Sequence, residues 1–205
     1  MNTIDTIIFD LGGVLIDWDP RYLYRKIFKS EDEITWFLQN ICTSEWNDEQ
    51  DAGRSFEEAT RELAEKHPDH REAIEAWYER WKETIKGPVH GTVDILTRIR
   101  NENNFRLYAL TNWSAETFPW ALDNFPFLHW FEGIVVSGVE RCRKPYPEIY
   151  HILFNRFQVD PARTLFIDDN IKNIQTGREL GLTTVHFSTP DQLEESLIRH
   201  GILKK

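Results

Sequence analysis

The sequence of 205 residues has few sulfur-containing side chains and no long apolar run. Its two cysteines, Cys42 and Cys142, lie far apart and form no C-x-x-C pair, which is typical of unpaired thiols in a reducing compartment. No apolar run approaches the length that spans a membrane. The start, MNTIDTIIFDLGG, lacks the basic residues that open a secretory signal. These absences predict a cytoplasmic protein with no membrane partner.

Positive charge is also scarce. The chain has 24 Lys and Arg against 34 Asp and Glu, for a net charge of −10, and no basic run or stripe offsets it. Nucleic acid is therefore not an expected partner. The seven histidines form no H-E-x-x-H motif, so we expect no zinc site. An acidic chain of this kind binds a phosphate group only where a metal or another local cation neutralises the charge.

What the chain does have is a regular alternation of strand and helix patterns. Buried parallel strands are predicted at Thr6–Phe9, Leu107–Leu110, Gly133–Val136 and Thr164–Ile167, with a weaker one at Thr183–Phe187. Helices are predicted between them at Thr92–Asn103, Pro147–Phe157 and Ile171–Leu180. Alternating strands and helices predict an α/β fold with a doubly wound, Rossmann-like parallel sheet.

Residues 18–87 have a different pattern. They combine clustered charges with several tryptophans and contain no convincing strand. Ser55–Glu58 has the pattern of a capping box that opens a helix. We therefore expect a small helical-bundle cap at 18–87, inserted after the first strand into a core of residues 1–17 and 88–205. Gly87-Pro88 marks the predicted return of the chain to the core.

Polar residues stand at the ends of the predicted strands. Asp10 ends the first strand, Thr111-Asn112 ends the second, and Asp168-Asp169 ends the fourth. Because the carboxyl ends of parallel strands share one edge of a sheet, these side chains are expected to converge. A further segment, Arg143-Lys144-Pro145, precedes a predicted helix and adds an ammonium group.

This set of residues predicts a phosphate and metal site. Asp10, Asp168 and Asp169 would repel one another if all were ionised, and Mg²⁺ prefers carboxylates together with water and a substrate phosphate. Lys144 would offset the repulsion between a phosphate dianion and an attacking Asp10, which would form an aspartyl-phosphate that water hydrolyses. Thr111 and the backbone around Gly12 and Gly13 are expected to hold the phosphoryl oxygens. Trp113 follows directly and is a candidate for stacking on a sugar ring.

The ordered segments F-D-L-G-G-V, L-T-N, R-K-P and F-I-D-D-N resemble the haloacid dehalogenase-like hydrolase superfamily. The start and the D-D-N-x-x-N segment are similar to its branch of small sugar phosphatases of the bacterial glucose-1-phosphate phosphatase type. The resemblance implies Mg²⁺-dependent hydrolysis of a small phosphorylated metabolite. The resemblance implies that Asp10 is the nucleophile and a metal ligand, and that Thr111 and Asn112 bind the phosphoryl group. Lys144 would pair with the nucleophile and with the phosphate. Mg²⁺ would be held by Asp168, Asp169 and the Gly12 carbonyl, and Asn173 would orient the acidic pair.

Gly12 departs from the family pattern. Most phosphatases of the family have a second Asp there, which acts as general acid and base, and glycine cannot move protons. Asp17 is one candidate replacement, although a solvated hinge residue explains it more simply. Gly12 also leaves two alternatives open, a 2-haloacid dehalogenase and a non-catalytic binding protein of the same fold. Trp46 and Arg54 are weaker candidates for substrate contact, and helix packing and solvation explain them more simply.

Overall fold

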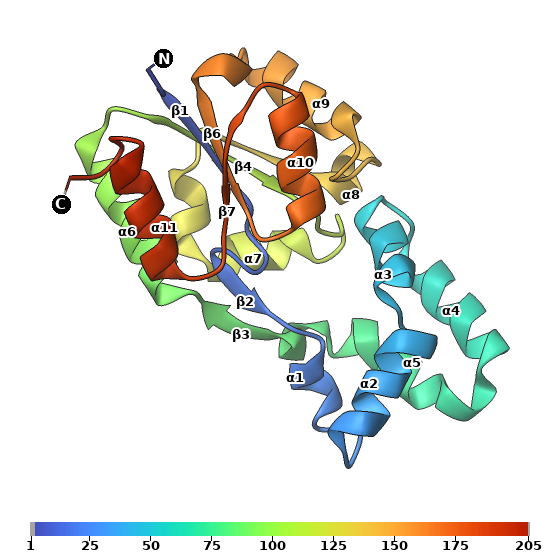
Figure 1. Cartoon of the computed structure of the whole chain (residues 1–205). Coiled ribbons are helices and arrows are strands. Elements are labelled where there is room, and N and C mark those ends of the chain that lie inside the picture. Colours follow the sequence, from blue (N-terminus) through green and yellow to red (C-terminus); the bar gives the residue numbers. More distant parts are fainter. Residues whose placement is uncertain (1–2, 205) are drawn as a thin grey trace.

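A parallel β-sheet forms the centre of the molecule, whose computed structural model describes residues 3–204 (Figure 1). Within these residues the sheet has five strands in the order β5-β4-β1-β6-β7, and each neighbouring pair is parallel. The strands are β1 (Thr6–Phe9), β4 (Arg106–Thr111), β5 (Gly133–Val136), β6 (Thr164–Asp168) and β7 (Thr183–His186). The predicted strands are confirmed to within one residue at each end.

Helices cover both faces of this sheet because its strands are apolar on both sides. Ile7 and Phe9 point to one face and Ile8 to the other, and all three are fully buried. The first face packs against α6 (His90–Glu102), α7 (Phe118–Asn124) and α11 (Pro190–Arg199). The second packs against α9 (Pro147–Phe157) and α10 (Ile171–Glu179), and the short α8 (Ser137–Glu140) follows β5. The doubly wound α/β fold is confirmed.

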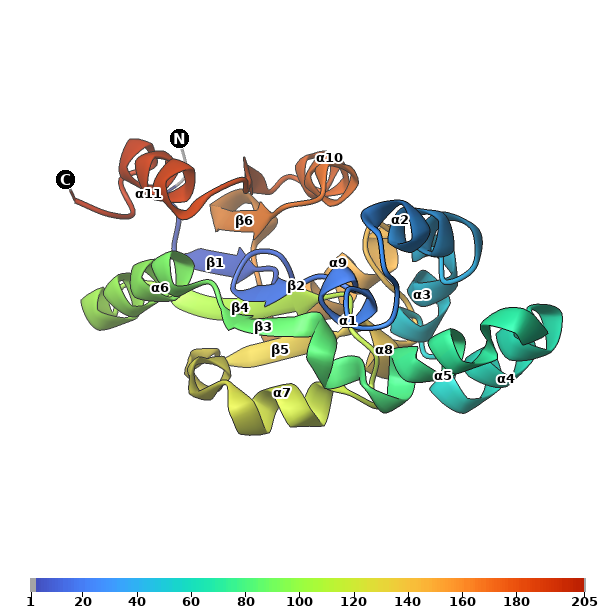
Figure 2. The ribbon, with the colours of Figure 1, turned by 90° about the horizontal axis from the view of Figure 1, so that it is seen from below.

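A second group of helices lies beyond the carboxyl ends of the strands (Figures 1 and 2). It comprises α1 (Arg21–Tyr24), α2 (Glu31–Asn40), α3 (Ser44–Asp51), α4 (Phe56–Lys66) and α5 (Arg71–Glu79). These helices have an apolar cluster of their own, in which the rings of Tyr24 and Phe37 lie 4.8 Å apart and Trp77 is also buried. The Glu58 N–H donates to the Ser55 hydroxyl oxygen and so caps α4, which confirms half of the expected capping box.

Short 3₁₀ turns complete the chain at η1 (Pro68–His70), η2 (Trp81–Thr84), η3 (Pro126–Trp130) and η4 (Pro161–Arg163). Among the described residues, no helix combines the length and the apolar character needed to cross a bilayer. The extents of the core and the helical insert, at 1–17 with 88–205 and at 18–87, stay predictions.

The expectation that residues 18–88 contain no strand is wrong. β2 (Ile16–Trp18) pairs antiparallel with β3 (Ile85–Pro88), so a two-stranded ribbon joins the helical group to the sheet. Both strands are only three or four residues long, and β3 contains glycine and proline, so neither shows an alternation long enough to predict a strand. They pair because the chain leaves the core through β2 and returns to it beside the same point through β3.

A pair of neighbouring residues on α2 tests how far the helical cluster depends on buried aromatics. Phe37 is fully buried, whereas its neighbour Trp36 is 49% exposed. We expect Phe37→Ala to lower the free energy of unfolding by about 3–5 kcal/mol through the lost burial and the cavity left behind. Trp36→Ala should change it by less than ~0.5 kcal/mol, as surface changes usually do. Urea denaturation followed by circular dichroism measures both, and equal effects would contradict the packing described.

Candidate active site

Pairing within the sheet brings three polar strand ends together. Phe9 of β1 lies opposite Ala109 of β4 and Ile167 of β6, and the Asp10 N–H donates to the Ile167 carbonyl at 2.9 Å. The residues that follow these positions therefore occupy one edge of the sheet, at the carboxyl ends of its central strands. The carboxylates of Asp10, Asp168 and Asp169 each offer an oxygen within 4.8 Å of the other two. The convergence expected of these segments is what the geometry shows.

A buried ammonium group joins two of these carboxylates. Lys144 Nζ lies 2.9 Å from Asp10 Oδ2 and 2.7 Å from Asp168 Oδ2, and the lysine side chain is 0% exposed. Burying an ammonium is costly unless charged partners surround it, and here two carboxylates do so. The position of Nζ is therefore fixed before any substrate arrives.

Asn112 holds the backbone of Lys144 from both sides. Its Nδ2 donates to the Lys144 carbonyl at 2.9 Å, and its Oδ1 accepts from the Lys144 N–H at 2.9 Å. This reciprocal pair ties the end of β4 to the loop that carries the lysine. Asn112 also lines the cavity described below. Its contact with substrate stays a prediction, whereas its contact with the Lys144 backbone is seen in the structure.

Burial and like charges change the protonation of the cluster. Burial raises the pKa of Asp10 well above its usual value, the carboxylates of Asp168 and Asp169 add to the effect, and Lys144 opposes it. Burial alone would lower the pKa of Lys144, but the charges of Asp10 and Asp168 outweigh it and raise that pKa. Burial and the neighbouring Asp168 also raise the pKa of Asp169. Two of the three carboxylates share one buried ammonium, and a further cation would relieve the repulsion that remains among them.

The two consecutive aspartates differ in their partners. Both oxygens of Asp168 accept from Asn173 Nδ2 at 3.0 Å, while Asn170 N–H and Lys144 Nζ fill the remaining positions. Within residues 3–204, no ion pair engages the carboxylate of Asp169. Asp168 therefore orients the lysine, whereas Asp169 keeps free oxygens. Carboxylate oxygens this close together suit a hard divalent ion such as Mg²⁺, so the residues fit the metal that the sequence predicts.

Gly13 and His186 place Asp169. A side chain on Gly13 would bring its Cβ to 2.4 Å from Asp169 Oδ2, so the missing side chain makes room for that carboxylate. Gly13 also has φ of +73°, a conformation that glycine adopts without strain. His186 Nε2 donates to the Asp169 carbonyl at 2.9 Å. No motif in the sequence pointed to this histidine, which acts through the backbone.

Thr111 ends β4 with a buried hydroxyl that lacks a partner. Its side chain is 0% exposed, and among the described residues nothing accepts from or donates to its Oγ1. A buried hydroxyl left unpaired costs roughly 1–3 kcal/mol, which a bound ligand would recover. Thr111 is absent from the described residues that line the cavity itself, and its role toward phosphate stays a prediction.

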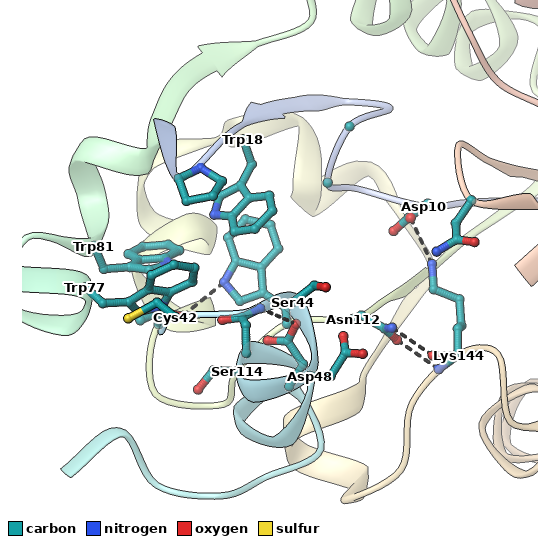
Figure 3. A pocket seen from close by; sticks show the side chains of 18 of the residues that line it. Asp10, Trp18, Cys42, Ser44, Asp48, Trp77, Trp81, Asn112, Ser114 and Lys144 are labelled. Carbon is teal, nitrogen blue, oxygen red and sulfur yellow. Dashed lines mark hydrogen bonds and ion pairs between the residues drawn. The ribbon is translucent and has the colours of Figure 1, made fainter. Parts of the chain in front are cut away.

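A cavity of about 480 Å³ opens beside this cluster, between the sheet edge and the second group of helices (Figure 3). Figure 3 shows Asp10 and Lys144 at one end and Trp18, Trp77 and Trp81 at the other. Its polar lining also includes Ser44, Asn47, Asp48, Asp51, Asn112, Ser114, Thr117, Asn170 and Asn173. Its apolar lining is completed by Pro20, Leu38, Cys42, Phe56 and Trp113. The size falls within the range of roughly 300–1,000 Å³ typical of small-molecule sites.

The predicted residues Gly12, Gly13 and Trp113 all line this cavity. Trp113 is 6% exposed, and its Nε1 donates to Thr117 Oγ1 at 3.1 Å, so its ring forms a fixed wall. Most lining residues from α2, α3, α4 and α5 were not predicted, because helical spacing indicates which face of a helix is buried but not which site that face lines.

Three weaker candidates lie elsewhere among the described residues. Asp17 accepts from the Tyr22 hydroxyl at 2.9 Å and lies 3.7 Å from Lys86, and it does not line the cavity. Arg54 is paired with Glu49 and Glu62, and Trp46 packs edge-on against Trp77; neither lines the cavity. The simpler explanations of these residues agree with the structure.

The fold and the strand-end acidic cluster define a hydrolase of the haloacid dehalogenase type. The family model for haloacid dehalogenase-like hydrolases matches residues 4–181, and the chain belongs to that family.

Several characterised relatives of this chain are phosphatases. D-ribitol-5-phosphate phosphatase of Bacteroides thetaiotaomicron is 24% identical over 88% of this chain and 90% of its own length. The sesquiterpene phosphatase of Aspergillus oryzae is 24% identical over 91% of each chain. Human N-acylneuraminate-9-phosphatase is 30% identical over 55% of this chain and 46% of its own. Their names span polar and apolar substrates.

Solved structures share the fold. The magnesium complex of a HAD family enzyme from Bacteroides thetaiotaomicron superimposes with a TM-score of 0.71 at 23% identity, covering 92% of this chain and 95% of that one. A dehalogenase superimposes with a TM-score of 0.64 at 14% identity, covering 90% and 84%. At these identities the likeness shows the fold alone.

The acidic cluster predicts that Mg²⁺ stabilises the protein. We expect the melting temperature to rise by roughly 5–10 °C between EDTA and Mg²⁺ at about 100 times its Kd, because the ion binds the folded state. Asp169→Asn should remove most of this rise, whereas Asp123→Asn, which changes an exposed acid on α7, should keep it. Differential scanning fluorimetry measures the shifts. A rise that survives Asp169→Asn would place the metal elsewhere.

Proposed function

We propose that this protein is a Mg²⁺-dependent phosphatase that hydrolyses a small phosphorylated metabolite, a sugar phosphate by preference, through an aspartyl-phosphate on Asp10. The observation that carries the proposal is the placement of Asp10. Its side chain is only 11% exposed, yet it lines the cavity and lies beside both the Lys144 ammonium and the free carboxylate of Asp169.

Asp10 has the geometry of a nucleophile held in one orientation. The Leu11 N–H donates to Oδ1 at 2.7 Å, and Lys144 Nζ contacts Oδ2 at 2.9 Å. In the first step a carboxylate oxygen of Asp10 bonds to phosphorus, the bond from phosphorus to the leaving oxygen breaks, and that oxygen keeps the electron pair. In the second step water displaces Asp10 from phosphorus and phosphate is released.

Fixed positive charge is what makes attack by a carboxylate on a phosphate dianion feasible. Lys144 supplies one such charge without moving, because Asp168 holds its ammonium from the other side. Asp10 and Asp169, with the Gly12 carbonyl, are the residues that would hold Mg²⁺. Asp168, predicted as a further ligand, already engages Lys144, Asn170 and Asn173 with its oxygens and would act on the metal site mainly through Lys144. When bound, Mg²⁺ offsets the carboxylate charge and polarises the phosphoryl oxygens. The unpaired Thr111 hydroxyl is suited to donate to one of those oxygens.

The mixed lining of the cavity supports a sugar phosphate. Sugars present apolar C–H faces to aromatic rings and hydroxyls to polar side chains, and the cavity offers both kinds of surface. D-ribitol-5-phosphate phosphatase and N-acylneuraminate-9-phosphatase are relatives whose names indicate substrates of this class. The sesquiterpene phosphatase is a relative with an apolar substrate, so the aromatic end could also take a hydrocarbon group.

One observation favours a second function. Gly12 stands where a phosphatase of the family usually has its second Asp, and haloacid dehalogenases lack that residue too. A dehalogenase would use Asp10 to displace halide without metal. The free carboxylate of Asp169 beside Asp10 argues against this, because it would repel a carboxylate substrate and has no task without a cation. The same intact set of Asp10, Lys144 and Asp169 argues against a non-catalytic binding protein.

Phosphate release tests the proposal directly. We expect inorganic phosphate to appear from at least one member of a panel of sugar, polyol and terpenyl phosphates in Mg²⁺, and not in EDTA. Asp10→Asn should lower the rate by about 10⁴-fold or more, because it removes the nucleophile. Chloride release from 2-chloropropionate without metal, with no phosphate released from any substrate, would support the dehalogenase instead.

Asp17→Asn is the matched control for this substitution. Asp17 lies on β2 and is held by Tyr22, away from the described cavity lining, so its loss should leave the rate at the wild-type level. A rate that falls equally in both variants would remove Asp10 from the role given to it.

A further inference from the structure

The position of Gly12 leaves a proton unaccounted for in the proposed reaction. An alcohol leaves phosphorus readily only if its oxygen gains a proton, and general acid catalysis of this kind contributes about 10²–10⁴-fold. Glycine has no group that could supply the proton. A sugar or polyol phosphate has a poor leaving group, so another side chain has to stand near the leaving oxygen.

The cavity itself limits the candidates. The titratable side chains among its described lining residues are Asp10, Cys42, Asp48, Asp51, Lys144 and Asp169. Asp10, Lys144 and Asp169 already serve the phosphoryl group and the metal. Burial raises the pKa of the Cys42 thiol to about 12, which makes it a poor proton donor at neutral pH. Two carboxyl groups remain, Asp48 and Asp51, and both belong to α3.

These two residues differ in what they contact. Asp48 Oδ2 lies 2.9 Å from Arg143 Nη2. Burial raises the pKa of Asp48, and the charge of Arg143 opposes that rise and favours the ionised form. Asp51 Oδ2 instead accepts a neutral hydrogen bond from Asn47 Nδ2 at 3.1 Å. Among residues 3–204, no cationic side chain forms an ion pair with Asp51. Of the two, Asp51 is the group that can carry a proton.

The surroundings of Asp51 bring its pKa close to neutral pH, where the protonated and ionised forms are both populated. Burial raises the pKa of Asp51 to about 7, the charge of Asp48 adds to the rise, and Arg143 with the hydrogen bonds of Asn47 and the Ser114 N–H opposes it. An acid with a pKa near the working pH is the most effective proton carrier.

α3 is docked against the core, and its last residue lines the cavity that also contains Asp10 and Lys144. Asp51 is its last residue, and Gly53 just beyond it lies so close to α8 that an added Cβ would be 3.0 Å from the Gly138 carbonyl. Ser114, from the loop that follows Thr111 and Asn112, lines the same cavity as Asp51. Asp48, one turn earlier on the same helix, faces the space between Asp10 and the tryptophans in Figure 3.

We propose that Asp51, supplied by α3 across the cavity, carries the proton that Gly12 cannot; the inference rests on the proposed phosphatase function. As the bond from phosphorus to the leaving oxygen breaks, that oxygen takes the proton of the Asp51 carboxyl group and departs as an alcohol. Asp51, now a carboxylate, then accepts a proton from the water that attacks the aspartyl-phosphate. Asp10 leaves as a carboxylate, and both aspartates return to their starting forms.

The experiment compares leaving groups in kcat/KM, which reports the first chemical step. We expect Asp51→Asn to lower kcat/KM by about 10²–10⁴-fold for the best polyol or sugar phosphate. For p-nitrophenyl phosphate, whose leaving group needs no proton, the fall should be less than ~10-fold. Asp48→Asn is the matched control on the same helix and should show no such selectivity. Asp51→Glu, which keeps a carboxyl group, should recover part of the loss.

The pH profile gives a second readout. Since only protonated Asp51 donates, kcat/KM for the alkyl phosphate should fall as the pH rises above about 7, and Asp51→Asn should lose this limb. Three results would overturn the assignment of Asp51 and leave the phosphatase function intact. They are an equal fall of kcat/KM for both substrates in Asp51→Asn, no fall for either, and a selective fall in Asp48→Asn instead. Wild-type protein that releases no phosphate in Mg²⁺ would overturn the function itself and the inference with it.

Discussion

The buried ammonium of Lys144 is the interaction on which the rest of the site depends. An ammonium without exposure costs several kcal/mol to desolvate, and two carboxylates at 2.7–2.9 Å offset that cost. Those carboxylates come from β1 and β6, while Asn112 at the end of β4 fixes the lysine backbone. The three central strands are therefore joined at their carboxyl ends by one charge, and removing Lys144 would leave the buried carboxylate of Asp168 without its ion-pair partner.

This arrangement divides tasks between two neighbouring aspartates. Asp168 uses its oxygens to hold Lys144, Asn170 and Asn173, and so belongs to the framework. Asp169 follows it outside the strand and keeps its oxygens for another ligand, in space that exists because residue 13 lacks a side chain. The framework is organised before a ligand binds, which is the condition under which electrostatic stabilisation of a transition state is most effective.

Much of this could be predicted from sequence, for a physical reason. Strand cores are short apolar runs, and the polar residues that end them must share a sheet edge, so the meeting of Asp10 with Asp169 follows from local patterns. The wall opposite them could not be predicted in the same way. Asp48 and Asp51 lie on a strongly polar helix. They line the cavity only because that helix docks against the core near the loop that follows β4. The β2–β3 ribbon was missed because its pairing joins distant segments too short to carry a period.

That ribbon has a consequence for how the molecule can vary. The chain leaves the sheet edge through β2 and comes back beside itself through β3, so more than sixty residues are attached at one narrow base. Changes in length or sequence among the attached helices can reshape the far wall of the cavity without disturbing the register of β1, β4 and β6. The carboxylate–ammonium cluster and the far wall of the cavity are thereby encoded in separate stretches of polypeptide. Asp51 excepted, the helices of the wall can drift over evolutionary time while the cluster stays constant.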